Sequence, residues 1–469
     1  MITAPTLPPL GTRASLLWLL LAAVSFHAAY TLPHPVPLGL AILLYPLALL
    51  QLTRQATPRR AFYWGLAAGY VCFAPQLFFF WEIFQTAAVV LWLILAVWTA
   101  LFALLVRLTT LRWGHPRALW LAPILWTGLE YSRSELYHLK FSWLNLGYAL
   151  PPALNPPGMY GTGFLIVLLT VALINLLPHP ARPRPLGLFL LTLIGSGLLI
   201  LLPARTITPT GSATARPLHL TGIQLEFPAP GVIPQALTQA LKHHPDTDVF
   251  VLSEYSCDGP VSDSVKDWCR TNHHYLVIGG RDPVPGSTNE FYNTAFVIAP
   301  DGQIAFRQAK AVPIPFFADG RPAPQQTLWN SPWGPIGICI CYDLSFTRVT
   351  DRLVAQGARL LIVPTMDVLE WGVHQHQLHA RVAPVRAMEY QLPIFRLASS
   401  GVSQAIDAAG HVVAATPIGA PNTVISATLT LREPGRLPWD RWLAPCCVSL
   451  TGIIALVHLY LARPRKKSQ

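Results

Sequence analysis

The chain has 469 residues, of which 52% are hydrophobic and only 12% are charged. Soluble domains carry about twice that share of charged side chains, so the composition indicates an integral membrane protein. The formal net charge of +11 could suit a nucleic acid, but the basic residues cluster in short loops between apolar runs and in the tail 463–467. Such clusters are typical of charges that set membrane topology, so we expect no nucleic-acid partner.

Eight apolar runs have the length of a transmembrane helix, which needs about 20 apolar residues. They cover residues 14–31, 36–53, 61–81, 86–106, 117–136, 160–178, 186–203 and 440–462. The first run follows Arg13 and is similar to a signal peptide, but more runs follow closely, so we interpret it as a retained anchor.

These runs divide the chain into parts. We predict a membrane domain with seven transmembrane helices at 1–203, a polar linker at 204–216 and a domain at 217–432. A last transmembrane helix at 440–462 and a basic tail at 463–469 follow.

The basic residues also predict the orientation of the chain. One set of alternate segments carries thirteen of them: Arg13, Arg54, Arg59, Arg60, Arg107, Arg112, Arg117, Arg182, Arg184, Arg463, Arg465, Lys466 and Lys467. The short loops of the other set carry only Arg133 and Lys140. By the positive-inside rule both termini are cytoplasmic, and the domain at 217–432 lies across the membrane from them.

Residues 217–432 alternate between two kinds of pattern. Strand-like apolar runs lie at 218–225, 249–253, 275–280, 294–299, 336–341, 360–364, 394–398 and 424–431. Helix-length stretches of mixed polarity lie between several of them, at 233–244, 345–357 and 373–391. Such alternation indicates an α/β domain.

The cysteines show no CxxC or Cys/His spacing of a metal site, and the chain has no phosphate-binding GxxxxGK loop. We therefore expect no metal and no cofactor. Cys257 and Cys269 could form a disulfide in an exported domain or remain free, and the sequence leaves both possibilities open.

Two residues at strand ends could carry chemistry. Cys341 ends the run 336–341, where a thiol is nucleophilic if a nearby cation stabilises its thiolate. The alternative is a core cysteine, as we interpret Cys339. Glu254 directly follows the run 249–253, where poor solvation can raise its pKa and make it a general base. The alternative is an ordinary loop acid.

Lys310 is the third candidate. It precedes the apolar, proline-rich segment 312–317, whereas Lys242 and Lys266 lie in polar helical stretches. An ammonium there could lower the pKa of a thiol and stabilise an oxyanion. The alternative is a surface lysine.

Glu254, Lys310 and Cys341, in this order at the ends of α/β elements, resemble the Glu-Lys-Cys triad of the nitrilase (carbon-nitrogen hydrolase) superfamily. With seven apolar runs before the domain and one after it, the chain is similar to the membrane-bound branch, the apolipoprotein N-acyltransferases. The resemblance implies an α-helical membrane bundle joined to an α-β-β-α sandwich. It also implies a multi-pass protein of the bacterial inner membrane with a periplasmic catalytic domain.

The resemblance implies an activity as well. A phospholipid would donate a fatty acyl chain, through a thioester on Cys341, to the α-amino group of the S-diacylglyceryl-cysteine of an apolipoprotein. The partners would be the phospholipid donor, the diacylated apolipoprotein acceptor and the bilayer, with the protein a monomer. A membrane-tethered amidase or an acyltransferase with a different amine acceptor is the alternative. A non-enzymatic scaffold is not favoured because the triad is present, and a transporter is not favoured because no repeat or midplane charge pair is evident.

Other segments extend the resemblance. Trp126, Glu130 and Arg133 share one helix face and precede the segment 141–148, as in the family's signature. Ionisable residues in a membrane helix are functional candidates, and the alternative is a Glu130–Arg133 pair that anchors the helix. The block 381–410 also resembles the family, and we interpret it mainly as scaffold: a helix, a strand and a hairpin.

Near the triad the chain departs from the family pattern. Ala318 stands where the family has a glutamate, with Asp319 one place later, and Tyr342-Asp343 replaces Tyr-Glu. We expect Asp319, Tyr342 and Asp343 to support substrate binding in a divergent member.

The apolar segment 312–317 is a candidate lid or membrane-dipping loop, with Phe316 as a substrate contact, and otherwise a buried packing segment. A lipid substrate gives such a loop a purpose. Moving an acyl chain into water costs about 0.8 kcal/mol per CH₂, so the triad must lie at the bilayer surface.

Overall fold

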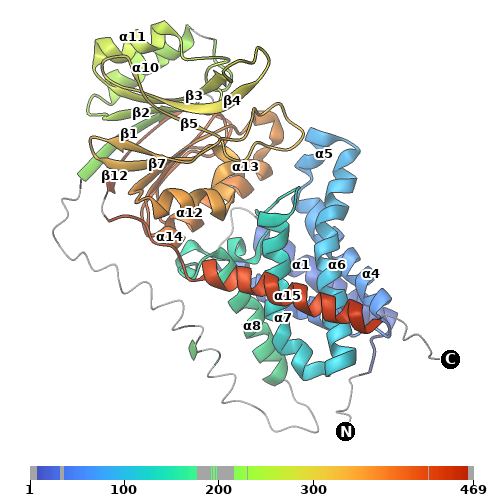
Figure 1. Ribbon diagram of the computed structural model, residues 1–469. Coiled ribbons are helices and arrows are strands. Elements are labelled where there is room, and N and C mark those ends of the chain that lie inside the picture. Colours follow the sequence, from blue (N-terminus) through green and yellow to red (C-terminus); the bar gives the residue numbers. More distant parts are fainter. Residues whose placement is uncertain are drawn as a thin grey trace. The chain divides into compact units, whose positions relative to one another are not determined.

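The computed structural model describes residues 8–31, 36–176, 216–229, 231–420, 422–431 and 433–462, with isolated positions between 192 and 197. The chain divides into two compact units (Figure 1). One is helical and comprises Met1–Thr208 and Pro438–Gln469, and the other is α/β and comprises Pro209–Leu437. Of the predicted linker, 204–215 lie outside the described residues and Arg216 is already the first residue of a strand.

The helical unit follows the predicted apolar runs. Its elements are α1 (Thr12–Tyr30), α2 (Val36–Gly39), η1 (Leu40–Leu43), α3 (Leu44–Leu52), α4 (Pro58–Gln76), α5 (Phe79–Phe84), α6 (Ala87–Trp113), α7 (His115–Tyr131), η2 (Ser132–Leu136), η3 (Leu146–Ala149), η4 (Pro152–Leu154), α8 (Met159–Leu176) and α15 (Asp440–Ala462). In the part of the chain that is described, α1, α6, α8 and α15 are long and apolar enough to cross a membrane.

The other predicted runs are shorter or interrupted. The run 36–53 is broken into α2, η1 and α3, and the run 61–81 is divided between α4 and α5. The run 117–136 ends in the π-helical turn η2. The run 186–203 lies outside the continuously described residues, so the count of eight transmembrane helices stays a prediction.

Small residues let α4 and α6 pack closely. A Cβ added to Gly65 would lie 2.7 Å from the Cβ of Ala103, and one added to Gly69 would lie 2.8 Å from the Cα of Ala96. Glycines four residues apart against alanines are the usual means by which membrane helices approach each other, because apolar surface alone gives little driving force there.

Asp440, the first residue of α15, caps the N-terminus of α8. Its Oδ2 accepts the backbone N–H groups of Tyr160 at 3.0 Å and Gly161 at 3.1 Å. These donors have no partner within their own helix, and a carboxylate at a helix N-terminus is favourable. The cap therefore ties the last helix to α8.

The α/β unit contains two six-stranded sheets, with orders β12-β1-β2-β3-β4-β5 and β11-β10-β9-β8-β7-β6. The strands are β1 (Arg216–Ile223), β2 (Val249–Leu252), β3 (Tyr275–Pro283), β4 (Phe291–Ile298), β5 (Ile304–Ala309), β6 (Leu328–Ser331), β7 (Gly334–Ile338), β8 (Leu360–Thr365), β9 (Ile394–Ala398), β10 (Gln404–Ile406), β11 (Val412–Ala415) and β12 (Val424–Leu431). The central strands of each sheet are parallel, β1 to β3 in one and β7 to β9 in the other.

Helices cover the outer face of each sheet, as Figure 1 shows. The helices are α10 (Val232–His243), α11 (Asp263–Asn272), α12 (Thr347–Ala355), α13 (Val373–Ala380) and α14 (Val382–Tyr390). The unit also contains two short 3-10 turns, η6 (Cys341–Ser345) and η7 (Leu369–Trp371). The inner faces meet closely at Gly222, where an added Cβ would lie 2.4 Å from Leu397. This arrangement is the predicted α-β-β-α sandwich.

Each predicted strand of the α/β domain overlaps an observed one, and β10 and β11 form the hairpin expected after the helix and strand of the block 381–410. The elements that were not predicted are β5, β6 and α11. Strands β5 and β6 lie at sheet edges, where half-exposed residues weaken the apolar signal. The predicted strand 336–341 is too long, since β7 ends at Ile338. Cys257 and Cys269, the latter on α11, are free thiols in one core cluster, and burial raises their pKa to about 11 and about 12.

Arg386 on α14 predicts a large stability effect. Its buried guanidinium donates to the carbonyls of Leu344 at 3.0 Å and Ser345 at 2.9 Å and pairs with buried Glu389 at 2.6 Å. Arg386→Met would break this buried ion pair and both hydrogen bonds to the carbonyls, which costs about 3–5 kcal/mol. Thermal unfolding of the full-length protein in detergent should therefore begin at a clearly lower temperature. Arg352→Met, on the exposed side of α12, is the control, and equal melting of the two variants would contradict this account.

Candidate active site

The three predicted catalytic residues follow three different strands: Glu254 follows β2, Lys310 follows β5 and Cys341 follows β7. The Lys310 Nζ lies 2.8 Å from Glu254 Oε1, and both side chains are buried. The backbone of Met366, just after β8, joins the other two. Its N–H donates to Glu254 Oε2 at 2.8 Å, and its carbonyl accepts the Cys341 thiol at 3.6 Å.

Cys341 lies in a strained turn. Its φ of 51° is in the left-handed region, which costs a non-glycine residue about 1–3 kcal/mol. Cys341 is the first residue of η6, shortly after β7, and is only 2% exposed. Such strain persists only when the surroundings hold it, and here neighbouring loops do so.

Asp343 ties the lysine loop to the cysteine turn. Its carboxylate accepts the backbone N–H groups of Val312 at 2.7 Å, Ala311 at 3.0 Å and Ile340 at 3.1 Å. Burial raises the pKa of Asp343 to about 6, although Lys310 and these N–H groups oppose the rise. Asp343 therefore holds the residues that directly follow Lys310 and the residue that directly precedes Cys341.

Asp319 is the second carboxylate on the lysine. Its Oδ2 lies 2.7 Å from Lys310 Nζ and accepts the N–H of Ile314 at 2.7 Å. Its Oδ1 accepts the amide of Asn293 at 2.7 Å and the hydroxyl of Tyr255 at 2.8 Å. Although Ala318 stands where the family has a glutamate, Asp319 thus supplies a carboxylate to the Lys310 ammonium.

Asn293 on β4 was not singled out from the sequence. Its buried side-chain amide donates both to Glu254 Oε1 at 2.6 Å and to Asp319 Oδ1. Its backbone carbonyl also accepts the N–H of Lys310 at 2.7 Å. A buried asparagine in an otherwise apolar strand was the available signal, because such a side chain needs hydrogen-bond partners.

The charges of this cluster separate the roles of the two carboxylates. Burial alone would lower the pKa of Lys310, but Asp319 and Glu254 raise it well above its ordinary value, so the ammonium stays charged. Burial would raise the pKa of Asp319, but Lys310 lowers it. Burial, reinforced by Asp319, raises the pKa of Glu254 despite Lys310. Divergent pKa values of this kind mark a fixed anion and a proton acceptor.

Ionisation of the Cys341 thiol depends on both Glu254 and Lys310. Burial and the charge of Glu254 raise the pKa of Cys341 well above its ordinary value, whereas Lys310 lowers it. A thiolate therefore forms here when its proton passes to Glu254, which removes the repulsive charge and leaves the ammonium as the counter-ion. This arrangement suits nucleophilic catalysis.

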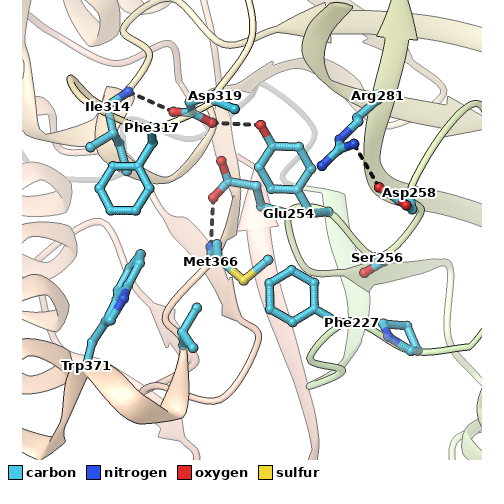
Figure 2. A pocket seen from close by; sticks show the side chains of 14 residues that line it. Phe227, Glu254, Ser256, Asp258, Arg281, Ile314, Phe317, Asp319, Met366 and Trp371 are labelled. Carbon is cyan, nitrogen blue, oxygen red and sulfur yellow. Dashed lines mark hydrogen bonds and ion pairs between the residues drawn. The ribbon is translucent and has the colours of Figure 1, made fainter. Parts of the chain in front are cut away.

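A pocket of about 680 Å³ opens beside this cluster. Figure 2 shows its lining: Glu254 and Asp319 lie between an apolar side with Phe317 and Trp371 and a polar side with Arg281 and Asp258. The lining is Phe227, Pro228, Glu254, Tyr255, Ser256, Asp258, Arg281, Ile314, Phe317, Ala318, Asp319, Met366, Val368 and Trp371.

Of the predicted supporting residues, only Asp319 belongs to this lining. Phe316 and Tyr342, which were expected beside the substrate, lie outside it. Phe316 is 70% exposed and has a φ of 70°. Tyr342 is buried, with its ring edge-on to Phe346 at 4.7 Å. Neither contacts the pocket, and their proposed part in substrate binding stays a prediction.

A second buried network fixes the segment that carries Met366. Asp367 pairs with Arg396 at 2.6 Å and with His379 Nδ1 at 2.7 Å, and its N–H donates to Ser399 Oγ at 3.1 Å. Burial would raise the pKa of Asp367, but His379 and Arg396 lower it. These contacts agree with the interpretation of the block 381–410 as scaffold.

Trp126, Glu130 and Arg133 are buried in the helical unit. Glu130 accepts the N–H of Leu146 at 3.0 Å, and Arg133 donates to the side chain of Asn145. No ion pair joins Glu130 to Arg133 in the described part of the chain, so the anchoring pair considered above is not formed. Instead, both residues bind the segment 141–148 that follows them in the sequence.

Comparison with known families bears on both units. The family model for carbon-nitrogen hydrolases matches residues 226–436, and that for the apolipoprotein N-acyltransferase N-terminal domain matches residues 14–175. The chain belongs to the apolipoprotein N-acyltransferases. It is a divergent member of that family within the nitrilase superfamily.

Individual relatives show the extent of the similarity. The chain is 26% identical to the apolipoprotein N-acyltransferase of Geobacter metallireducens over 91% of this chain and 92% of the relative. It is 26% identical to that of Shewanella oneidensis over 83% of this chain and 86% of the relative. Among solved structures, Saccharomyces cerevisiae Nit3, a member of branch 10 of the nitrilase superfamily, matches with a TM-score of 0.41 and 18% identity, covering 55% of this chain and 100% of that one.

The cluster predicts how the reactivity of Cys341 depends on pH. Alkylation by iodoacetamide should rise with pH as Glu254 loses its proton, and this rise should lie above the range of an ordinary glutamate because the pKa of Glu254 is raised. Asp319→Asn removes an anion that raises this pKa, so the rise should move to lower pH. Peptide mass spectrometry of Cys341 measures the rate, and Asp282→Asn, in a partly exposed pair with Arg307 away from the pocket lining, is the control. A shift to higher pH in Asp319→Asn would contradict the assignment.

Proposed function

We propose that the protein transfers a fatty acyl chain from a phospholipid, through a thioester on Cys341, to the N-terminal α-amino group of the S-diacylglyceryl-cysteine of an apolipoprotein. The observation that carries the proposal is the buried cluster in which one ammonium, Lys310, serves two carboxylates beside the thiol. It occurs in a chain whose two units both match the apolipoprotein N-acyltransferase family. Lipoprotein N-acylation is the activity of that family.

The first half-reaction acylates the enzyme. Glu254 takes the thiol proton, and the Cys341 thiolate attacks the carbonyl carbon of a phospholipid ester. An ammonium has three N–H donors, and Glu254 and Asp319 take two of those of Lys310, so the third can stabilise the oxyanion. The intermediate collapses to the thioester, and the lysophospholipid leaves with the proton from Glu254.

The second half-reaction transfers the acyl chain. The free α-amino group of the acceptor attacks the thioester carbon while Glu254 accepts its proton. The C–S bond breaks, the amide forms, and the proton returns to the Cys341 sulfur. Water would compete with the amine for the thioester, and the apolar side of the pocket, formed by Phe317 and Trp371, limits its access.

The cellular setting is part of the proposal. The protein lies in a bacterial inner membrane with seven helices before the catalytic domain and one after it, with both termini cytoplasmic and the domain periplasmic. The arginine-rich loops described above support this orientation. The protein acts as a monomer on a phospholipid donor and a diacylated apolipoprotein acceptor. The carboxylate that Asp319 keeps on Lys310 removes the main reason to favour a different acceptor.

The thioester is the intermediate that tests the reaction. Purified protein incubated with phosphatidylglycerol should gain one acyl mass on Cys341, and a diacylated lipopeptide added afterwards should take up that mass. Cys341→Ser should abolish the acyl-enzyme thioester, whereas Cys339→Ser, a buried thiol below the turn, should retain it. Mass spectrometry of the protein and the lipopeptide reads both steps. Absence of acyl-Cys341 would sink the mechanism, and acyl-Cys341 without lipopeptide product would point to a different acceptor.

The apolar side of the pocket predicts a dependence on acyl chain length. The rings of Phe317 and Trp371 lie 6.2 Å apart and are suited to contact the acyl chain. Trp371→Ala should reduce acylation from a 16-carbon donor about tenfold, but acylation from a 4-carbon donor about twofold or less, since each buried CH₂ contributes about 0.8 kcal/mol. Initial rates of acyl-Cys341 formation with the two donors provide the measurement. Equal losses for both donors would mean that Trp371 acts on the structure of the site instead.

A further inference from the structure

The polar side of the pocket contains an arginine to which the proposed chemistry gives no role. Among the residues that line the pocket, Arg281 on β3 is the only basic one, whereas Glu254, Asp258 and Asp319 are acidic. Figure 2 shows Arg281 and Asp258 across the pocket from Phe317 and Trp371, with Glu254 between the two sides. A ligand that fills the pocket therefore has an apolar wall at one end and a guanidinium at the other.

Backbone contacts fix Arg281 relative to the proposed base. The segment 253–259, which carries Glu254 and Asp258, lies along β3. Its Ser253 carbonyl accepts the N–H of Gly279 at 3.2 Å, and its Gly259 carbonyl accepts the N–H of Arg281 at 3.2 Å. In the ladder with β4, Arg281 lies opposite Asn293, the residue that binds Glu254. The guanidinium is thus attached to the same rigid frame as the base.

Two aromatic rings and one carboxylate hold the guanidinium. It lies 4.9 Å from the centre of the Phe291 ring and 5.7 Å from that of Tyr255. Its Nη1 lies 3.0 Å from Asp258 Oδ1, and the side chains of Arg281 and Asp258 are 44% and 89% exposed. In the described part of the chain no second carboxylate lies within 4 Å of it. Because the rings contact the face of the guanidinium, the N–H groups at its edge stay available for a planar, bidentate contact.

We propose that Arg281 binds the phosphate diester of the phospholipid donor and so selects phospholipids over uncharged esters. The proposal rests on the proposed function, since it names the donor recognition of the same site. A phospholipid carries its phosphate only a few covalent bonds from the ester carbonyl that the thiolate attacks. Arginine forms bidentate, charge-assisted hydrogen bonds with phosphate oxygens. With the acyl chain against Phe317 and Trp371, the phosphate would lie on the side of Arg281.

Asp258 competes with the phosphate for the guanidinium. Because the pair is exposed, breaking it costs little, and the phosphate can replace the carboxylate. The carboxylate also repels a second anion. Removing the charge of Asp258 should therefore strengthen donor binding, whereas removing that of Arg281 should weaken it, so two neighbouring substitutions have opposite predicted signs.

The test compares two donors with the same acyl chains in mixed micelles: dipalmitoyl phosphatidylglycerol and 1,2-dipalmitoylglycerol, which lacks the phosphate. The measured quantity is the donor preference, the ratio of their apparent second-order rate constants for acyl-Cys341 formation by the full-length protein. Arg281→Gln should lower this ratio about tenfold to a hundredfold, as expected for the loss of hydrogen bonds to a charged group. Arg281→Lys should lower it less because it retains the charge, and Asp258→Asn should raise it.

Arg307→Gln is the matched control. Arg307 on β5, in the same sheet, is also an exposed arginine in an ion pair, with Asp282 at 3.5 Å, and it also lies over an aromatic ring, that of Phe296. It does not line the pocket, so its substitution should leave the donor preference unchanged. An equal loss with both donors in Arg281→Gln would assign Arg281 a structural role, and an unchanged ratio would overturn the proposal.

A binding measurement separates this proposal from the proposed function. Cys341→Ala cannot form the thioester, yet it should bind lysophosphatidylglycerol, and Arg281→Gln in that background should weaken binding about tenfold or more. Inorganic phosphate at the same concentration tests whether the site binds a free anion, and it should compete only weakly with lysophosphatidylglycerol. If wild-type protein forms no acyl-Cys341 with either donor, the proposed function fails. If it does, but Arg281→Gln leaves both the ratio and the binding unchanged, only the assignment of Arg281 fails.

Discussion

The candidate site depends on one buried ammonium that is shared by two carboxylates. A buried lysine keeps its charge only when anions compensate the loss of water, and Asp319 and Glu254 do so for Lys310. The two carboxylates are not equivalent, because Asp319 also accepts hydrogen bonds from Asn293, Tyr255 and Ile314. These contacts hold Asp319 as an anion. One cation cannot fully compensate two anions, so the affinity for a proton resides on Glu254, next to the thiol.

The residues of the site lie in loops after the strands, so contacts other than strand pairing must fix them. The loop after β5 and the turn after β7 are joined by Asp343, which accepts backbone N–H groups from both. The segment after β8 is fixed by Asp367, through Arg396 and His379. Each buried carboxylate thus converts an irregular segment into a rigid support. This rigidity is what allows Cys341 to keep a positive φ while its thiol donates to the Met366 carbonyl.

The sequence was informative where apolar runs end and less so elsewhere. Cys341 and Glu254 could be found because each terminates a buried run, and Lys310 because it precedes an apolar loop. Nothing in side-chain identity could reveal that the backbone of Met366 connects Glu254 with the thiol. Arg281 had the appearance of any polar residue near a strand end. Its position in the pocket depends on the pairing of β3 with β4 and on the path of the segment 253–259, which are set by tertiary structure.

The charges around the pocket fall into two classes that differ in solvent exposure. The pairs of Lys310 are buried, and separating them would leave charges without water, so these side chains stay in place while the proton moves between them. The pair between Arg281 and Asp258 is exposed and contributes little to stability, so it can open at small cost. In the proposed ping-pong reaction, the two kinds of pair would have different roles. The groups that move the proton must stay in place through both half-reactions, whereas the groups that recognise the donor must release its headgroup before the acceptor can enter.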